Sequence, residues 1–235
     1  MNKKFIAGML AAGILYLPLS AEAYDTKPLQ LPQNQFFYLY ETQVDFNIKE
    51  QLQRAKSLIE DEKDYRMAIA VCNQIIELDP NVSLAYLFKS FALTEMKNYS
   101  AAEDECQKAI NIESENPTFY YFKAMNYLYW ADNFDKGNSN HRYYSDRAVD
   151  EFHNALNFEK KYINAIIGVG DAYMRKADYN RACISIDGGY RRKDAIENYN
   201  KAIDEYNKVL VLFPKNSAIL AKKSIAQNAL AEVQN

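Results

Sequence analysis

Residues that break helices are scarce in this chain of 235 residues, which has only 7 glycines and 6 prolines. A protein built from strands and tight turns needs more of both. A disordered chain would have fewer apolar residues than the 49% found here. The composition therefore predicts an all-α protein with enough apolar surface for a core.

Neither sign of charge dominates, because the formal net charge is −3 and basic and acidic residues are mixed along the chain. No basic patch for nucleic acid is visible. Histidine is rare as well. His141 and His153 are 12 residues apart, outside the spacings that bind zinc. We expect His141 in a surface loop and His153 on the outer face of a helix.

Motifs that carry chemistry are also missing. Residues 132–137 resemble a calcium loop, but Phe134 and Lys136 stand where oxygen ligands are required. The two glycine pairs, 168/170 and 188/189, lack the preceding strand of a phosphate-binding loop. No serine lies in a nucleophile elbow. We therefore predict no enzymatic activity, no cofactor and no metal site.

The first 23 residues have the pattern of a secretory signal peptide. Lysines at positions 3 and 4 precede the uncharged apolar stretch 5–19, and Ala21-Glu22-Ala23 offers the small residues that a signal peptidase reads. The apolar stretch is short for a membrane span, which needs about 20 residues. We predict cleavage after Ala23 and a periplasmic or secreted bacterial protein, with no stable membrane span after cleavage.

A set of small and apolar residues recurs through the rest of the chain. The recurring sets are Ala68, Cys72, Ile75 and Leu78; Ala102, Cys106, Ala109 and Ile112; Ala148, Phe152, Ala155 and Phe158; and Ala202, Tyr206, Val209 and Leu212. Their spacing of four, three and three places each set on one face of a helix. The first two sets are 34 residues apart, which is the period of a helical repeat.

The helix before each set carries a matching pattern. In the last repeat, Gly170 supplies a small residue for close helix approach, and Tyr173 an aromatic ring to cover it. This arrangement resembles the tetratricopeptide repeat (TPR) family from Lys49 to about Asn216. The resemblance implies a right-handed α-α superhelical solenoid of about four TPR-like helix pairs.

The 34-residue period also divides the chain into segments. We expect an N-terminal aromatic segment at 24–48, repeats at 49–82, 83–116, 117–162 and 163–216, and a C-terminal capping helix at 217–235 with Ser217 as its N-cap. The third repeat carries about 12 extra residues around 133–145, and the fourth about 20 around 180–200. The first repeat matches weakly, since Lys56 and Ile59 stand where small and aromatic residues are usual.

The three cysteines are expected to be unbridged. Cys72 and Cys106 occupy equivalent positions of successive repeats, about 10 Å apart, whereas a disulfide needs Cα atoms within about 7 Å. We expect both to be buried in the core. Cys183 is expected to be a free thiol in the longer insertion.

The resemblance implies that the first helices of the repeats line a concave protein-binding groove. Its predicted apolar residues are Leu84, Leu87, Phe91, Tyr121, Met125, Leu128, Tyr129, Ile167 and Met174. The same register places Glu60 and Asp61 on an acidic rim. Leu87 and Phe91 stand where the family's clamp for a carboxylate terminus would need Lys and Asn, so that mode is not supported.

The pattern predicts an exported scaffold or adaptor that binds another exported or envelope protein through this groove, in cell-envelope assembly or secretion. The segment Leu29–Tyr40 can instead cap the first repeat or cover the groove, the insertions can fold over it, and the chain can form homo-oligomers. The alternative function is binding of a small molecule or glycan on a tyrosine-rich surface at Tyr143, Tyr144 and Tyr190.

Overall fold

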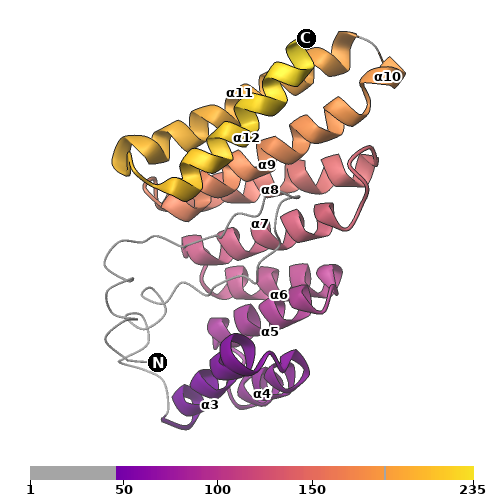
Figure 1. The fold of residues 1–235 in the computed structure, drawn as a ribbon. Coiled ribbons are helices and arrows are strands. Elements are labelled where there is room, and N and C mark those ends of the chain that lie inside the picture. The colour runs from indigo at the N-terminus through magenta and orange to yellow at the C-terminus, as the bar shows by residue number, and fades with distance from the viewer. Residues whose placement is uncertain (1–45, 188) are drawn as a thin grey trace. The chain divides into compact units, whose positions relative to one another are not determined.

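Helix follows helix through the part of the chain that the computed structural model describes, residues 46–187 and 189–235 (Figure 1). No strand occurs in these ranges. The predicted all-α helical-repeat fold is confirmed. The predicted signal peptide and the segment 29–40 lie outside the described residues, so those expectations stay predictions.

The described residues form two compact units, which we call unit 1 (46–114) and unit 2 (115–235 without Gly188). Unit 1 contains α3 (Phe46–Ser57), the π-helix η1 (Leu58–Glu62), α4 (Tyr65–Leu78), α5 (Ser83–Glu95) and α6 (Tyr99–Ile112). Unit 2 contains α7 (Pro117–Asp132), α8 (Ser139–Phe158), α9 (Ile163–Ala182), α10 (Ile184–Asp187), α11 (Gly189–Leu212) and α12 (Ser217–Gln234).

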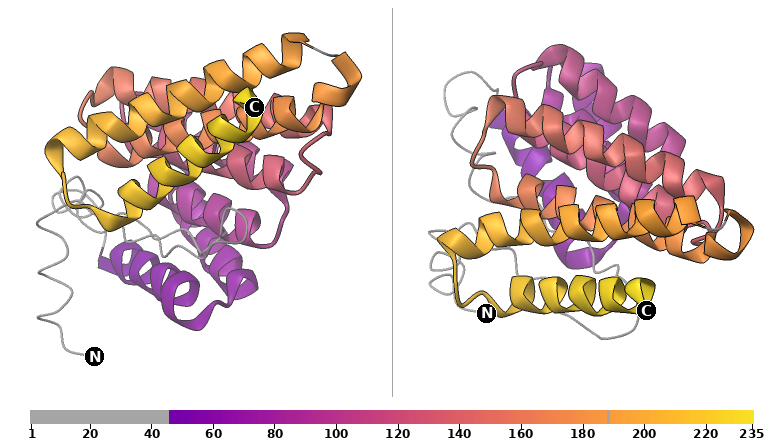
Figure 2. Two further views of the ribbon diagram at one scale, coloured as in Figure 1. Left: turned by 45° about the horizontal axis from the view of Figure 1, so that its top comes forward. Right: turned by 90° about the horizontal axis from the view of Figure 1, so that it is seen from above.

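Within each unit, helices that follow one another in the chain pack side by side as pairs. In unit 1, α3 contacts α4, and α5 contacts α6; in unit 2, α7 contacts α8, and α9 contacts α11. The last helix, α12, lies along α11 without a second helix to complete a pair (Figure 2). The register predicted from small residues holds, because Ala68, Ala102, Ala148 and Ala202 are all fully buried.

Asparagine and aspartate side chains begin several of these helices. Asp64 accepts a hydrogen bond from the Met67 amide at the start of α4. Asn116 and Asn138 cap α7 and α8 in the same way. The cap of α12 is Asn216, one residue before the predicted Ser217, because the Asn216 carboxamide accepts from the amide of Ile219. These caps satisfy backbone donors that have no partner inside the helix.

The weak match of the first repeat has a local cause in η1. A π-helical turn accommodates one extra residue. This turn lies between the first helix of the repeat and α4, where Ala68 is again in register. The buried small residue of α3 is accordingly Ala55, which is fully buried, one position before Lys56.

The extra residues of the third and fourth repeats extend helices. Only six residues, 133–138, separate α7 from α8, whereas α8 and α9 each run for 20 residues and α11 for 24. The connection 133–138 contacts the C-terminal end of α9. Lys136 Nζ lies 2.7 Å from Asp178 Oδ2, and the Cys183 Sγ lies 3.7 Å from the carbonyl oxygen of Gly137.

All three cysteines are free and buried. Burial raises the pKa of the Cys72 thiol to about 12, so the reactive thiolate is disfavoured there. Cys183, which the sequence placed in an insertion, has only 5% of its surface exposed.

Close approach at Gly170 is confirmed, although the ring involved is not Tyr173. A Cβ atom at Gly170 would stand 2.6 Å from Cε1 of Tyr206, which belongs to α11. The aromatic residue that covers the glycine therefore comes from the second helix of the repeat.

Candidate protein-binding site

Unit 2 carries six of the predicted groove residues on the first helices of its two repeats, α7 and α9, which contact each other. These residues are Tyr121, Met125, Leu128 and Tyr129 on α7 and Ile167 and Met174 on α9. Leu128 and Met174 are buried, each with 2% of its surface exposed. Met125, Tyr129 and Ile167 are half-buried. We call these three residues the α7/α9 face.

Tyr121 belongs to an aromatic cluster in the core. Its ring centroid lies 5.8 Å from that of Phe152 and 5.4 Å from that of Tyr162, and 7% of the residue is exposed. Burial raises the pKa of the Tyr121 hydroxyl above its ordinary value, and the Asp171 carboxylate adds to this effect. The hydroxyl therefore stays neutral, and the ring contributes mainly to packing.

Unit 1 carries the other three predicted residues, all on α5. Leu84, Leu87 and Phe91 have exposed fractions of 6%, 0% and 2%. Such buried side chains cannot be replaced by charged ones without loss of folding. The half-buried α7/α9 face is consequently the better place to test binding.

Acidic side chains of unit 1, among them Asp61 of the predicted acidic rim and Glu95 at the end of α5, make contacts inside the unit. Asp61 accepts a hydrogen bond from Ser57, and Glu95 accepts one from the Tyr65 hydroxyl at 3.2 Å. Burial and the nearby Glu95 carboxylate raise the pKa of Tyr65 to about 12. Burial also raises the pKa of Glu60.

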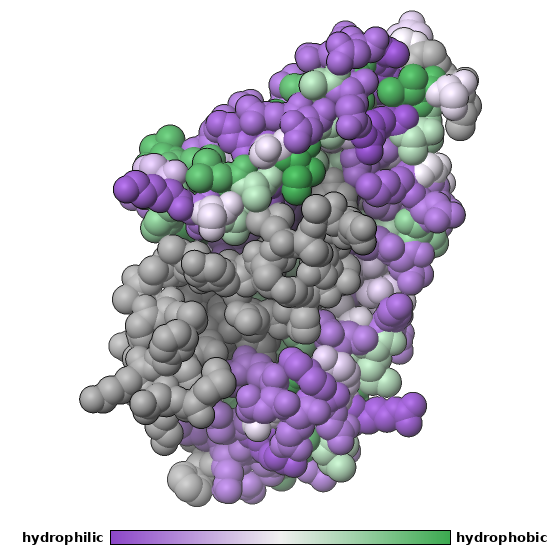
Figure 3. All heavy atoms as spheres, viewed as in Figure 1, coloured by the Kyte–Doolittle hydropathy of each residue, from purple (hydrophilic) through white to green (hydrophobic). Residues whose placement is uncertain are grey.

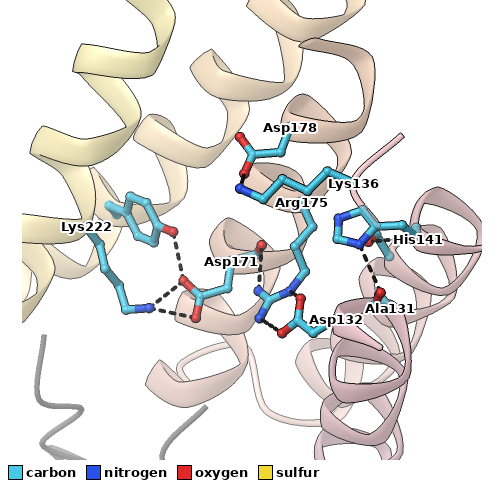
Figure 4. Close-up of polar contacts among 10 residues, drawn as sticks. Ala131, Asp132, Lys136, His141, Asp171, Arg175, Asp178 and Lys222 are labelled. Carbon is cyan, nitrogen blue, oxygen red and sulfur yellow. Dashed lines mark hydrogen bonds and ion pairs between the residues drawn. The ribbon is translucent and has the colours of Figure 1, made fainter. Parts of the chain in front are cut away.

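Two polar residues of α9, Asp171 and Arg175, form ion pairs within unit 2 (Figure 4). Arg175 donates from Nε and Nη2 to both carboxylate oxygens of Asp132, at 2.7 and 2.6 Å. Asp171 accepts from Lys222 at 2.8 and 2.9 Å and from the Tyr206 hydroxyl at 2.8 Å. These contacts tie α9 to α7, α11 and α12.

A third carboxylate on α9 follows the same pattern. Asp178 is 4% exposed, pairs with Lys136 and accepts a hydrogen bond of 2.6 Å from the Tyr199 hydroxyl. Asp171, Arg175 and Asp178 are four and then three residues apart, so they share one face of the helix. Their charges are neutralised inside the unit, which leaves apolar contact as the main recognition chemistry of the α7/α9 face.

An ion pair that recurs within repeats was not predicted from the sequence. Lys89 on α5 pairs with Glu105 on α6, and Lys123 on α7 pairs with Glu151 on α8, at 3.1 and 2.8 Å. The partners are 16 and 28 residues apart, and the difference equals the predicted 12-residue extension. A search for opposite charges at equivalent repeat positions would have found this pair.

The expected surface position of His141 is wrong. His141 lies in α8 with 2% of its surface exposed, and its Nδ1 is 2.9 Å from the carbonyl oxygen of Ala131 (Figure 4). His153 is exposed, as expected. Within the described residues, no group of three His, Cys, Asp or Glu side chains is placed to hold a metal ion. None of the described helices combines the length and apolar character needed to cross a bilayer.

Comparison with known proteins supports the resemblance to TPR proteins. A TPR repeat-containing protein of Methanocaldococcus jannaschii is 24% identical over 190 residues, which cover 77% of this chain. The chain spans 31% of the length of that relative. No family model matches the chain.

Solved structures show the same type of fold. The crystal structure of a thermophilic TPR protein from Thermus thermophilus matches 77% of this chain and 98% of its own, with 13% identity and a TM-score of 0.50. A crystal structure of MamA protein matches 69% of this chain and 74% of its own, with 20% identity and a TM-score of 0.49. The match to the Thermus thermophilus structure shows that the chain shares the all-α helical-repeat fold of that TPR protein.

Proposed function

We propose that this chain is a non-catalytic scaffold that binds a segment of another exported or envelope protein on the α7/α9 face. The observation that carries the proposal is the partial exposure of Met125, Tyr129 and Ile167 on the first helices of adjacent repeats. Leu128 and Met174 on the same two helices are buried in the core. Stacked helical repeats are a common way to build an extended binding surface.

Apolar anchors are the chemistry that fits this face. Each half-buried side chain can lose further contact with water when a partner docks, which contributes about 25 cal/mol for every Å² of apolar surface removed. Arg175 and Asp171 already pair with Asp132 and Lys222. A partner with an apolar helix or extended segment therefore fits better than a charged terminus.

Site-specific photocrosslinking in the producing cells tests the proposal. A photoreactive residue at position 125 is expected to form an adduct with one defined protein. Val211, which is 79% exposed on α11, is the control position for non-specific capture. Met125→Glu should lower recovery of the same protein at least ten-fold, because it buries a charge in an apolar contact.

Two results would contradict the binding proposal. One is the same set of adducts from positions 125 and 211. The other is undiminished recovery with Met125→Glu in a protein whose circular dichroism and unfolding midpoint are unchanged.

Export is part of the proposal and has its own test. The pattern of residues 1–23 supports cleavage after Ala23 and a periplasmic or secreted protein. N-terminal sequencing of the protein recovered from the cell envelope or medium should begin at Tyr24. Recovery of an intact N-terminus from the cytosol alone would contradict export.

A further inference from the structure

Aromatic rings gather where the third repeat is extended, at the end of α7 and the start of α8. Tyr144 stacks on Trp130 with ring centroids 4.1 Å apart and an interplanar angle of 15°. Tyr127 and Phe134 are also nearly parallel to Tyr144, with centroids 6.3 and 5.9 Å away. We call these four residues the aromatic ladder.

Tyr143 lies at the edge of the ladder and combines exposure with a fixed orientation. Half of its surface is exposed, yet its ring makes an edge contact with Tyr144 at 5.0 Å. Arg147 donates a 3.0 Å hydrogen bond to the Tyr143 hydroxyl and another of 2.5 Å to that of Tyr127. The Arg147 guanidinium also lies over both rings, 4.9 Å from the centroid of Tyr127 and 5.9 Å from that of Tyr143.

Tyr190 shows how an exposed tyrosine behaves without such support. It is 81% exposed on α11 and makes no hydrogen bond or ring contact with any described residue. The tyrosine-rich surface predicted from the sequence is therefore divided. Tyr143 and Tyr144 belong to one cluster, and Tyr190 is a separate exposed ring.

Exposed polar residues lie close to Tyr143 in the chain. The connection 133–138 and the first residues of α8 expose Asn133, Ser139 and Asn140. Phe134 holds this connection against the ladder. A rigid aromatic face beside amide and hydroxyl groups suits a ligand that has one apolar face and many hydroxyl groups.

Charged side chains close to this surface make contacts within unit 2. Arg147 uses two of its donor groups on tyrosine hydroxyls. Asp146 pairs with Lys176 at 2.6 Å and with Arg142 at 3.6 Å. The uncharged side chains of Asn133, Ser139 and Asn140 are exposed in the same segment, and they favour a ligand that is recognised through its hydroxyl groups.

We propose that Tyr143, oriented by Arg147 and the aromatic ladder, is a stacking platform for a neutral carbohydrate, with hydrogen bonds from the polar residues of 133–140. The C–H groups on one face of a pyranose ring pack on the tyrosine face, and the sugar hydroxyls pair with the neighbouring amides. This site is distinct from the α7/α9 face, so either proposal can fail while the other holds.

The chain contains a built-in reporter, since Trp130 is its single tryptophan. The mature protein is titrated with maltotriose, cellotriose and triacetylchitotriose, and tryptophan emission and binding heat are both recorded. We expect saturable binding of at least one trisaccharide. Tyr143→Ala should weaken it about ten-fold through loss of ring stacking, whereas Tyr143→Phe should retain most of it.

Matched control variants distinguish sugar binding at Tyr143 from non-specific binding to an exposed tyrosine and from binding at the α7/α9 face. Tyr190→Ala and Met125→Glu should bind the same trisaccharide with unchanged affinity. The proposal is overturned if no trisaccharide gives saturable heat, or if Tyr143→Ala binds as tightly as the unaltered protein. A photoreactive residue at position 143 that captures one protein, without any sugar binding, would also overturn it in favour of a protein contact.

Discussion

In both units the two helices of a repeat approach closely, but different side chains fill the contact. In unit 1, the close approach of α5 and α6 joins two small residues, with the Ser90 hydroxyl 2.8 Å from the Cys106 sulfur and 2.9 Å from the carbonyl oxygen of Ala102. In unit 2, the equivalent positions hold Gly170 and Tyr206, a residue without a side chain against a large ring. In unit 1 the two facing side chains are both small, whereas in unit 2 one position has no side chain and the other has a large ring. Both combinations let the two helices pack closely.

The units also differ in helix length and in what holds the longer helices together. The α-helices of unit 1 have 12 to 14 residues, whereas α7 to α9 and α11 of unit 2 have 16 to 24. The longer helices of unit 2 extend the apolar core toward their ends, because Ala177, Ala195 and Tyr199 are fully buried in one apolar cluster. Unit 2 joins these ends by ion pairs such as Arg175–Asp132 and Lys136–Asp178. The extensions of unit 2 therefore combine apolar packing with ion pairs.

Figure 3 shows a further trait of unit 2, an apolar area at the turn between α11 and α12. Val211, Leu212 and Leu220 are 79%, 52% and 45% exposed there. Scattered exposed apolar residues are normal, so this area gives no information about function by itself.

Removing one partner of the Arg175–Asp132 pair should have the largest effect on stability. Asp132→Ala leaves the guanidinium of Arg175 without its carboxylate partner, and only 8% of the Arg175 side chain is exposed. We expect a loss of about 3 kcal/mol in unfolding free energy, measured by urea denaturation, since breaking a buried pair strands a charge. Hydrogen exchange should increase in α7 and α9 and stay nearly unchanged in α5 and α6.

The matched change in unit 1 is Lys89→Met, which leaves Glu105 paired with Lys108 at 3.1 Å. The loss of unfolding free energy in Lys89→Met should be smaller, about 1 kcal/mol. The double change Asp132→Leu with Arg175→Met should restore most of the lost stability. Equal losses for Asp132→Ala and Lys89→Met would show that the two units do not differ in their dependence on ion pairs.

Replacing Gly170 in unit 2 by serine, the residue at the equivalent position 90 of unit 1, should have an intermediate effect on stability. In Gly170→Ser, the new Cβ meets the Tyr206 ring at 2.6 Å, so the two helices must separate. We expect a loss of about 2 kcal/mol from overpacking. Gly189→Ser is the control, because no atom lies within 4 Å of a Cβ at that position. An unchanged unfolding midpoint in Gly170→Ser would contradict the close approach.

The sequence predicted the features that depend on local periodicity and failed on those that depend on tertiary partners. Ala68 and Ala202 identified the buried faces because the period of a helix fixes which residues share a side. His141 was misplaced because the extra residues of the third repeat were expected to form a loop, whereas they lengthen α8. The partners of Asp171 and Arg175, Lys222 and Asp132, are 51 and 43 residues away, and no local pattern links them.

The candidate binding residues show the same limit. Their assignment to first helices was correct, since α5, α7 and α9 hold all nine. Their individual exposure was not predictable from the period, because it depends on rings such as Phe152 and Tyr162 that pack against Tyr121 from other parts of unit 2. Only the structure separates half-buried Met125 from buried Leu128.

The smallest expected effect concerns charge in unit 1, where burial raises the pKa of Glu60 above its ordinary value. For a carboxyl group whose pKa is raised by folding, the folded state binds its proton more tightly, so stability falls as pH rises through that pKa. Glu60→Gln should therefore raise the unfolding free energy at pH 7 by up to about 0.5 kcal/mol and have almost no effect at pH 3. Lys56, whose Nζ lies 3.8 Å from the carboxylate, opposes this shift in pKa, which keeps the expected gain in unfolding free energy small.

Urea denaturation of the unaltered protein and of Glu60→Gln across pH 3 to 8 measures the difference. Glu50→Gln is the control, because Glu50 is an exposed residue on the preceding helix α3. A loss of stability at pH 7 in Glu60→Gln would mean that the Lys56 pair outweighs the burial of the carboxylate.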